Sequence, residues 1–165
     1  FSPDTELGRW LATRNTMLRI GRNLFVHAGL SARLLERNLE MDTLNARMSE
    51  GLYRTSKERR EDPTLEFLYR SAGPVWYRGM VCTDEKYDPL TPEQTDALLR
   101  RYDADRLLIG HTIFPDISTF HDGRVIAVNV QNERNRRKNR GRAVLIEGSR
   151  ISVVGNRGVK RVLEE

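Results

Sequence analysis

Apolar residues fall into short runs along this chain, and two of these runs lead into a histidine. The run 24–26 precedes His27, and the run 107–109 precedes Gly110 and His111. Uninterrupted apolar runs of this length predict buried strands. Polar side chains at the carboxyl ends of such strands point into the loops where α/β folds hold their ligands. We therefore expect His27 and His111 to belong to a ligand site.

Apolar residues at helical spacing dominate the first two-thirds of the chain. We predict helices over residues 4–19, from a Ser31 cap to Leu39, and over 42–60, 65–70 and 91–102. The last of these has the clearest start, because Thr91, Pro92 and Gln94 fit a capping box with proline at the first helical position. We predict strands over 107–109, 116–120, 125–130, 143–146 and 151–154, the last two joined as a hairpin through residues 147–149. Helices first and a mostly antiparallel sheet last predict an α+β (mixed α/β) fold.

The composition is that of an ordinary globular chain. It has 165 residues, of which 38% are hydrophobic and 31% charged, so we treat residues 1–165 as a single unit with a real core. No apolar stretch approaches the length of about 20 residues that a membrane span needs. The single cysteine, Cys82, excludes an internal disulfide. The compartment stays open: the cytoplasm is favoured, and the periplasm applies if a signal lies upstream.

Histidine chemistry makes a metal site the first hypothesis for the two strand ends. Neutral imidazole is the commonest metal ligand in proteins, so His27 and His111 could share one ion. A zinc site needs three or four protein ligands, and His121 lies in the sequence 119–123, which reads as a hairpin turn. The alternative for any one of these histidines is a hydrogen-bonded core or loop residue. Asp84 and Asp88 are acidic candidates that we interpret as turn formers.

Three motifs, taken in order, resemble the calcineurin-like metallophosphoesterases of the phosphoprotein-phosphatase branch, specifically the bacterial Shewanella-like type. The sequence Val-His-Ala-Gly-Leu-Ser at 26–31 resembles an early element of the second half of these enzymes, and Gly-His-Thr at 110–112 resembles a late one. Between them, Trp-Tyr-Arg-Gly at 76–79 matches a third. The family's opening motifs, Asp-x-His, Gly-Asp-x-x-Asp-Arg-Gly and Gly-Asn-His-Glu, do not occur here. The resemblance therefore implies that residues 1–165 are the C-terminal half of a metallophosphoesterase domain whose N-terminal half is absent.

That resemblance also implies a mechanism and a fold. His27 and His111 would complete the second of two divalent metal sites, occupied by manganese, iron or zinc, and Arg78 would be the catalytic residue that holds the substrate phosphate. The activity implied is phosphomonoester hydrolysis by a metal-activated water, on serine/threonine phosphoproteins, with this chain inactive alone. The fold implied is half of a four-layer α-β-β-α sandwich, so an exposed sheet face should lead to self-association or take up the missing half. The alternative for Arg78 is a salt-bridged structural arginine.

Positive charge is concentrated near the end of the chain. The net charge is +5, and six basic residues crowd into 134–142. We interpret this tract as a solvated hairpin loop between the strands at 125–130 and 143–146. The resemblance places that loop beside the catalytic cleft, so Arg134, Arg136 and Arg137, together with Tyr77, are candidate substrate-binding residues. The alternative is that the tract only keeps the loop soluble.

Two other functions remain open at this stage. Related families with the same metal core hydrolyse dinucleoside polyphosphates or other small phosphate esters, and the metal site does not fix the substrate. From a different class, the chain could be a non-catalytic basic fragment that binds RNA or another polyanion. The basic tract contains no aromatic residue to stack bases, so nucleic acid is the less favoured partner. A nucleic-acid binder should lose affinity steeply with salt and ignore chelators.

Overall fold

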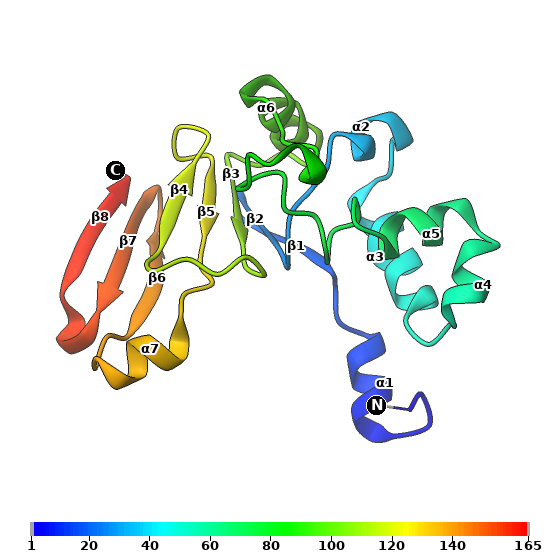
Figure 1. The fold of residues 1–165 in the computed structure, drawn as a ribbon, viewed down its shortest axis with the longest axis horizontal. Coiled ribbons are helices and arrows are strands. Elements are labelled where there is room, and N and C mark those ends of the chain that lie inside the picture. The colour runs from blue at the N-terminus through cyan, green and yellow to red at the C-terminus, as the bar shows by residue number, and fades with distance from the viewer. Residues whose placement is uncertain (1, 165) are drawn as a thin grey trace.

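The structure, a computed structural model, describes residues 2–164 and confirms an α+β fold (Figure 1). The α-helices are α1 (Glu6–Ala12), α2 (Arg33–Arg37), α3 (Met41–Gly51), α4 (Ser56–Arg60), α5 (Pro63–Tyr69), α6 (Pro92–Arg101) and α7 (Asn132–Arg137), and 3-10 turns cover η1 (Glu85–Tyr87) and η2 (Asn156–Gly158). The strands are β1 (Met17–Ile20), β2 (Asn23–Val26), β3 (Arg106–Ile109), β4 (Ser118–Phe120), β5 (Val125–Ala127), β6 (Arg142–Glu147), β7 (Arg150–Gly155) and β8 (Lys160–Glu164).

The strands form two separate sheets. The first has the order β1-β2-β3-β5-β4, and the second is the antiparallel sheet β6-β7-β8. Strands β2, β3 and β5 run parallel at the centre of the first sheet, with Val26 opposite Ile109 and Ile109 opposite Ala127. The carboxyl ends of these parallel strands therefore meet at one edge, which is the edge that carries the two histidines.

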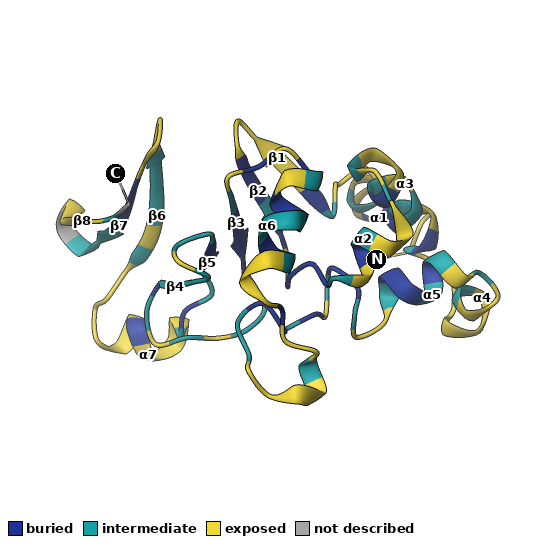
Figure 2. Ribbon diagram, turned by 90° about the horizontal axis from the view of Figure 1, so that it is seen from above, coloured by how far each residue is buried: buried dark blue, intermediate teal, exposed yellow. Residues whose placement is uncertain are grey.

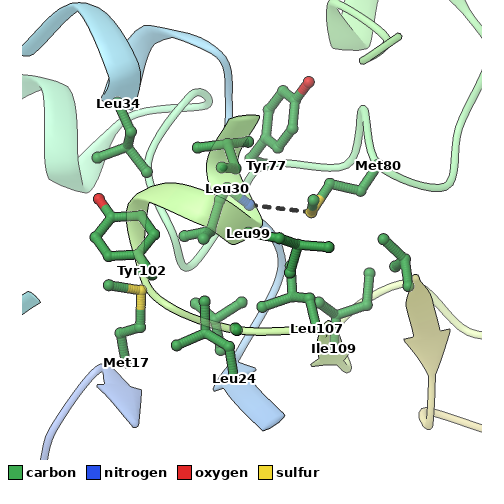
Figure 3. Packing of buried hydrophobic residues seen from close by; sticks show 14 of the residues in the cluster. Met17, Leu24, Leu30, Leu34, Tyr77, Met80, Leu99, Tyr102, Leu107 and Ile109 are labelled. Carbon is green, nitrogen blue, oxygen red and sulfur yellow. Dashed lines mark hydrogen bonds between the residues drawn. The ribbon is translucent and has the colours of Figure 1, made fainter. Parts of the chain in front are cut away.

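Alternate residues of the central strands supply two different cores. Leu24 on β2 and Leu107 and Ile109 on β3 pack into the larger cluster, which the helices cover (Figure 3). Phe25 and Leu108 alternate with them and point to the opposite face, where Leu108 joins a smaller cluster with Ile151 and Val153 of β7. Leu24 and Leu107 are at most 1% exposed. Burial of both faces explains why these strands read as unbroken apolar runs.

The second sheet covers only part of that opposite face. It stands apart from β2 and β3 in the view from above (Figure 2). A groove of about 810 Å³ lies between them, lined by Phe25 and Leu108 on one side and Val144 and Ile146 on the other. Leu18 and Ile20 of β1 lie along the same groove, and the Ile20 side chain is 59% exposed. The groove leaves apolar side chains of this face exposed, while the assignment of the chain to half of a sandwich stays a prediction.

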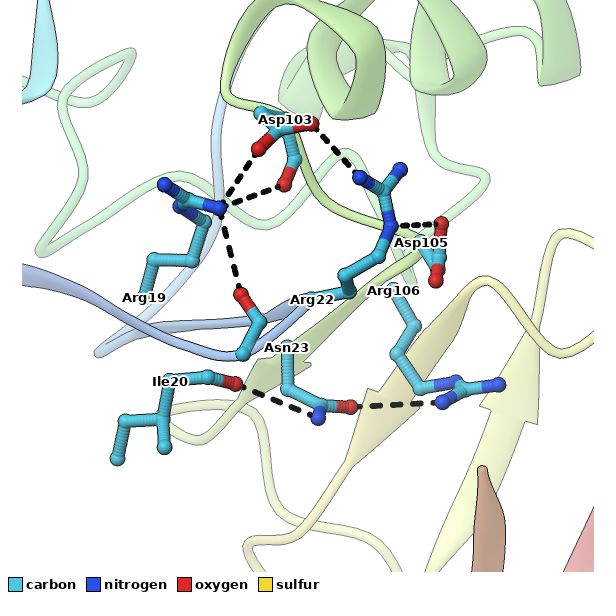
Figure 4. Close-up of polar contacts among 8 residues, drawn as sticks. Arg19, Ile20, Arg22, Asn23, Asp103, Asp105 and Arg106 are labelled. Atoms are coloured by element: carbon cyan, nitrogen blue, oxygen red, sulfur yellow. Dashed lines mark hydrogen bonds and ion pairs between the residues drawn. The ribbon is translucent and has the colours of Figure 1, made fainter. Parts of the chain in front are cut away.

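Ion pairs join loops at the amino ends of the parallel strands, away from the histidines (Figure 4). Arg19 and Arg22 each contact the Asp103 carboxylate at 2.7 Å, and Arg22 also reaches Asp105 at 2.7 Å. These side chains are a third to two-thirds exposed, so each pair stabilises the fold by at most about 1 kcal/mol. The network fixes how the β1–β2 turn meets the loop before β3.

Two of the predicted helices are wrong in extent. The predicted helix over 4–19 ends at Ala12, and its last apolar residues lie in β1, where Met17 pairs with Val26. Pairing with β2 outweighs local helical spacing there. The predicted helix over 42–60 divides into α3 and α4, because Thr55 forms a capping box with Glu58 and begins a new helix. The predicted helices at 65–70 and 91–102 are confirmed, the second with the expected capping box at Thr91.

Two local predictions are also wrong. The basic tract is not a hairpin loop, because β5 and β6 belong to different sheets and the segment between them forms α7. Ser31 does not cap α2, since its hydroxyl donates to the Ala72 carbonyl at 2.8 Å instead. The turn assignments hold: Asp84 caps η1, and Asp88 follows it with a φ of 52°. Within residues 2–164, no helix has the length and apolarity to cross a membrane.

Candidate functional site

The two strand-end histidines meet, as the sequence predicts. The parallel register of β2 and β3 places His27 and His111 just beyond the paired residues Val26 and Ile109. The Gly110 amide donates to the His27 carbonyl at 2.8 Å, which continues the strand pairing. The Nε2 atom of His27 lies 3.1 Å from the Nδ1 atom of His111.

His111 is held in an uncommon backbone conformation. Its φ of 58° is left-handed, which disfavours residues other than glycine and asparagine and clusters at functional sites. The Asn129 side chain donates from Nδ2 to the His111 carbonyl at 3.2 Å, and the next amide, Thr112, donates to the Gly110 carbonyl at 2.6 Å. These contacts fix the turn that directs the imidazole toward His27.

The surroundings of His111 favour its neutral form. Burial is the largest cause that lowers the pKa of His111, and the positive charges of Arg78 and His27 lower it further. The Nε2 atom of His111 is buried and has no hydrogen-bond partner among the described residues. A neutral imidazole is the form that binds a metal ion.

The geometry of the pair fits a shared metal ion. Two nitrogens that each lie about 2.1 Å from one ion, at 90–109° to each other, are about 3.0–3.4 Å apart. The observed separation of 3.1 Å between His27 Nε2 and His111 Nδ1 falls in that range, and it is equally the length of a hydrogen bond between the two rings. Over residues 2–164, no group of three or more His, Cys, Asp or Glu side chains could hold a metal. A metal bound by this histidine pair would therefore need further ligands from outside the described residues.

Arg78 lies beside the histidines, on a loop tied to the β2–α2 loop. The amides of Ala28 and Gly29 both donate to the Pro74 carbonyl, which brings residues 74–79 alongside. Arg78 donates from Nη1 to the Thr112 hydroxyl at 2.9 Å, and no described residue forms an ion pair with it. The structural alternative, a salt-bridged arginine, is therefore not what the described contacts show. An unpaired guanidinium next to two imidazoles is suited to bind a phosphate.

Trp76 completes this site and was not predicted to do so. The sequence favours a packing role for it, yet the side chain is 55% exposed. Its ring meets His111 edge-on, with centroids 5.5 Å apart and planes at 88°. Thr112 also contributes without having been singled out as a site residue, whereas the sequence names Asn129 as a candidate for lining the cleft. Thr112 belongs to the Gly-His-Thr motif, and Asn129 lies two residues after the end of β5. These positions are the sequence signals that identify them.

Tyr77 and His121 lie outside the histidine pair, each in a different setting. Tyr77 is 2% exposed, burial raises its pKa, and its hydroxyl donates to the Asp88 carbonyl, so only the ring faces a pocket. His121 is separate from the histidine pair, with ring nitrogens 3.3 Å from the Thr95 hydroxyl and 3.0 Å from the Met80 carbonyl oxygen. The hydrogen-bonded loop alternative is therefore correct for His121.

The arginines of α7 stand on the solvent side of a neighbouring depression. Arg134, Arg136 and Arg137 are exposed, and Arg137 pairs with Glu133 at 2.5 Å. Arg134 shares a depression with Ile113, which follows the His111 turn directly. The helix thus lies near the site, with side chains free to meet a ligand that approaches from solvent. Their role as substrate-binding residues stays a prediction.

Known proteins of similar structure point to a class of enzyme. The structural neighbours are phosphatases. The chain superposes on a cold-active protein tyrosine phosphatase with a TM-score of 0.87 and 28% identity over 99% of its length. A mutant of a cold-active protein tyrosine phosphatase and the cold-active enzyme of a psychrophilic Shewanella species give the same score and identity over 98% of the chain.

These matches cover only part of the neighbours. The chain spans 46% of the length of each of the three structures. No family model matches the sequence, and no curated protein sequence does. The comparisons support a phosphatase fold, and the chemistry has to be argued from the histidine pair and Arg78.

Proposed function

We propose that this chain supplies the second-metal ligands and the phosphate-binding arginine of a calcineurin-like metallophosphoesterase that hydrolyses phosphomonoesters on proteins. The observation that carries the proposal is the 3.1 Å separation of the two imidazole nitrogens, with Arg78 anchored next to them through Thr112. The remaining metal ligands would come from a segment outside this chain. That the chain spans under half of its phosphatase neighbours supports this view.

The donor atoms suit the proposed metals. Neutral nitrogens are ligands for manganese, iron and zinc alike, so His27 Nε2 and His111 Nδ1 would hold one ion of a pair. When bound, two divalent ions supply charge that polarises a phosphoryl oxygen and acidifies a water. The Asn129 side chain donates a hydrogen bond to the His111 carbonyl and so keeps the His111 imidazole turned toward His27.

Arg78 performs the second task of the site, which is to hold the phosphate. Its guanidinium donates to Thr112 through Nη1 and keeps its other N–H groups available. A planar, permanently charged fork binds two phosphoryl oxygens and stabilises the charge that develops on them. The exposed edge of Trp76 against His111 limits how a substrate side chain enters.

The structural neighbours are named protein tyrosine phosphatases, and a cysteine nucleophile is a competing chemistry for a phosphatase. The surroundings of Cys82 do not favour it. Reactive thiolates need an electropositive setting. Cys82 is half-buried, and no described Arg, Lys or His side chain forms a hydrogen bond with its thiol. We therefore place the chemistry at the histidines.

The experiment that tests this proposal measures hydrolysis of p-nitrophenyl phosphate with added manganese. This chain is assayed alone and together with a separately supplied N-terminal half. We expect activity only in the mixture, a loss of at least about 100-fold in His27→Ala and His111→Ala, and loss on adding a chelator. Cys82→Ser is the matched control and should retain full activity.

Several outcomes would overturn the proposal. Activity that survives chelation and disappears in Cys82→Ser would move the chemistry to the thiol. Absence of activity in every mixture would return weight to the basic polyanion-binding alternative. Peptides carrying phosphoserine, phosphothreonine or phosphotyrosine, and a dinucleoside polyphosphate, then separate the substrate classes; the serine/threonine preference stays a prediction.

A further inference from the structure

Arg78 also lines a second space, a pocket of about 600 Å³, which we name the basic pocket. Its cationic lining residues are Arg33, Arg70, Arg78 and Lys86, against a single carboxylate, Asp88. The two histidines are not among its lining residues. Two of its lining residues, Trp76 and Arg78, lie beside His111, so the basic pocket adjoins the histidine pair without including it.

Most of this positive charge lacks a protein partner. Lys86 pairs with Asp84 at 2.9 Å and lies over the Tyr87 ring at 4.8 Å. By contrast, Arg33, Arg70 and Arg78 form no ion pair with any residue that the structure describes. Three guanidinium groups that form no ion pair with a carboxylate therefore line one pocket. They attract an oxyanion, which guanidinium binds through paired hydrogen bonds.

The backbone fixes these arginines close to one another. The Ser31 hydroxyl donates to the Ala72 carbonyl at 2.8 Å. The amides of Ala28 and Gly29 donate to the Pro74 carbonyl and join the same two loops. Arg33 lies two residues after Ser31, and Arg70 lies two residues before Ala72. The two side chains therefore extend from adjoining segments that hydrogen bonds hold together, so the charge cluster is built into the fold.

We propose that the basic pocket binds a second anionic group of the substrate, the carboxylate or phosphate of a side chain that flanks the scissile phosphate in a phosphoprotein. This proposal rests on the proposed function and deepens it by naming the substrate class. Arg78 would hold the scissile phosphate, while Arg33 and Arg70 hold the flanking anion. The substrate class is thus a protein segment with at least two anionic groups.

The rings that line the pocket favour a peptide over a nucleotide. The Tyr69 ring is covered by the Arg59 guanidinium at 3.9 Å, and Lys86 lies over Tyr87. Tyr77 is almost fully buried, whereas Trp76 meets the His111 ring at 88° and is 55% exposed. A base needs a free ring face to stack on. Three of the four rings are covered or buried and only Trp76 has an exposed surface, so most of this lining serves better as apolar walls for side chains.

The test measures affinity for labelled phosphopeptides that differ at one flanking position. The protein is this chain with its N-terminal half, kept in a chelator so that no turnover occurs. The flanking residue is alanine, glutamate or phosphoserine, and ADP is the nucleotide probe. Variants are Arg33→Gln, Arg70→Gln and the double variant, with Arg100→Gln on the exposed side of α6 as the charge-matched control.

We expect the acidic peptides to bind about tenfold tighter than the alanine peptide, which corresponds to about 1.4 kcal/mol. The ratio should fall to within about twofold in the double variant and stay unchanged in Arg100→Gln. The glutamate and phosphoserine arms show which anion the pocket prefers. Equal affinities in the unmodified protein, a ratio that survives the double variant, or tighter binding of ADP would each overturn the proposal.

The same protein separates this proposal from the proposed function. Hydrolysis of p-nitrophenyl phosphate with manganese needs no flanking group and reports on the catalytic site alone. Failure of that reaction counts against the metallophosphoesterase assignment, whereas the peptide affinity ratio decides the pocket whether or not turnover occurs.

Discussion

The two faces of the five-stranded sheet carry similar apolar side chains, but one face is fully covered and the other is partly open. One face, with Leu24 and Leu107, is closed under the helices and excludes water. The other face, with Phe25 and Leu18, borders a groove of about 810 Å³ that the second sheet covers only in part. His27 lies at the end of β2 and lines this groove. The difference shows that the apolar pattern of a strand determines which side chains can face a core. Other segments of the fold determine what covers each face of the sheet.

This contrast has a functional meaning for the site. The closed face holds the strand ends rigid, so that His27 and His111 meet within 3.1 Å. The open face leaves a groove next to His27, which is among its lining residues. One member of the histidine pair therefore lies where the closed core borders an open groove.

Truncation of the closed face should give the largest effect. Leu24 is 0% exposed, whereas Leu18, which lies opposite Phe25 on the paired strand, is 44% exposed. We expect Leu24→Ala to lower the free energy of unfolding by about 2–5 kcal/mol, because a cavity adds to the lost burial. Leu18→Ala should change it by no more than about 0.5 kcal/mol. Chemical denaturation of both variants makes the comparison, and equal losses would contradict it.

A charge on the open face should weaken association by the next largest amount. We predict that the chain alone self-associates through the groove, since an apolar face of this size is seldom left bare. Burial of an isoleucine contributes about 1.5–3 kcal/mol, so Ile20→Lys should raise the dimer dissociation constant at least about tenfold. Sedimentation velocity measures this, with Val159→Lys, 69% exposed and outside the groove, as the control. An unmodified chain that stays monomeric at all concentrations would refute the prediction.

The sequence was sufficient for the elements whose signals are local and strong. The capping box at Thr91 and Gln94 placed the start of α6 correctly, because its hydrogen bonds form within one turn. The apolar runs before His27 and Gly110 placed β2 and β3. They also placed the two imidazoles at one edge of a sheet, since parallel neighbours end together. The proximity of His27 and His111 follows for these physical reasons, whereas their role as metal ligands stays a prediction.

What failed depended on strand pairing and sheet membership, which helical spacing alone does not reveal. Residues 17–20 have helical spacing, yet they form β1 because β2 offers them a strand to pair with. The segment 132–137 became α7 because β6 joined a sheet other than that of β5. Thr112 could not be assigned to Arg78 from sequence, since 34 residues separate them and only the folded loops bring them together.

Removal of the Thr112 hydroxyl should produce a moderate effect on catalysis. This hydroxyl accepts a hydrogen bond from Arg78 at 2.9 Å and so fixes the direction of the guanidinium. A net hydrogen bond contributes about 0.5–1.5 kcal/mol, so Thr112→Val should raise KM for an aryl phosphate about 2–10-fold. Thr112→Ser keeps the acceptor and should restore KM. Steady-state kinetics on the complemented enzyme decides this, and a serine variant as impaired as the valine variant would rule out the positioning role.

The pH dependence of His111 should be the smallest effect, since its side chain is only partly buried. Its pKa lies below the ordinary value of 6.5, chiefly through burial and then through Arg78 and His27. The stability that this group contributes is therefore complete above about pH 6.5 and falls as the pH drops toward the folded-state pKa. Arg78→Gln removes one positive neighbour and should raise the pKa of His111 toward 6.5. NMR titration of the His111 ring measures the pKa in the unmodified protein and in the variant, and an unchanged pKa in Arg78→Gln would show that Arg78 does not contribute to the shift.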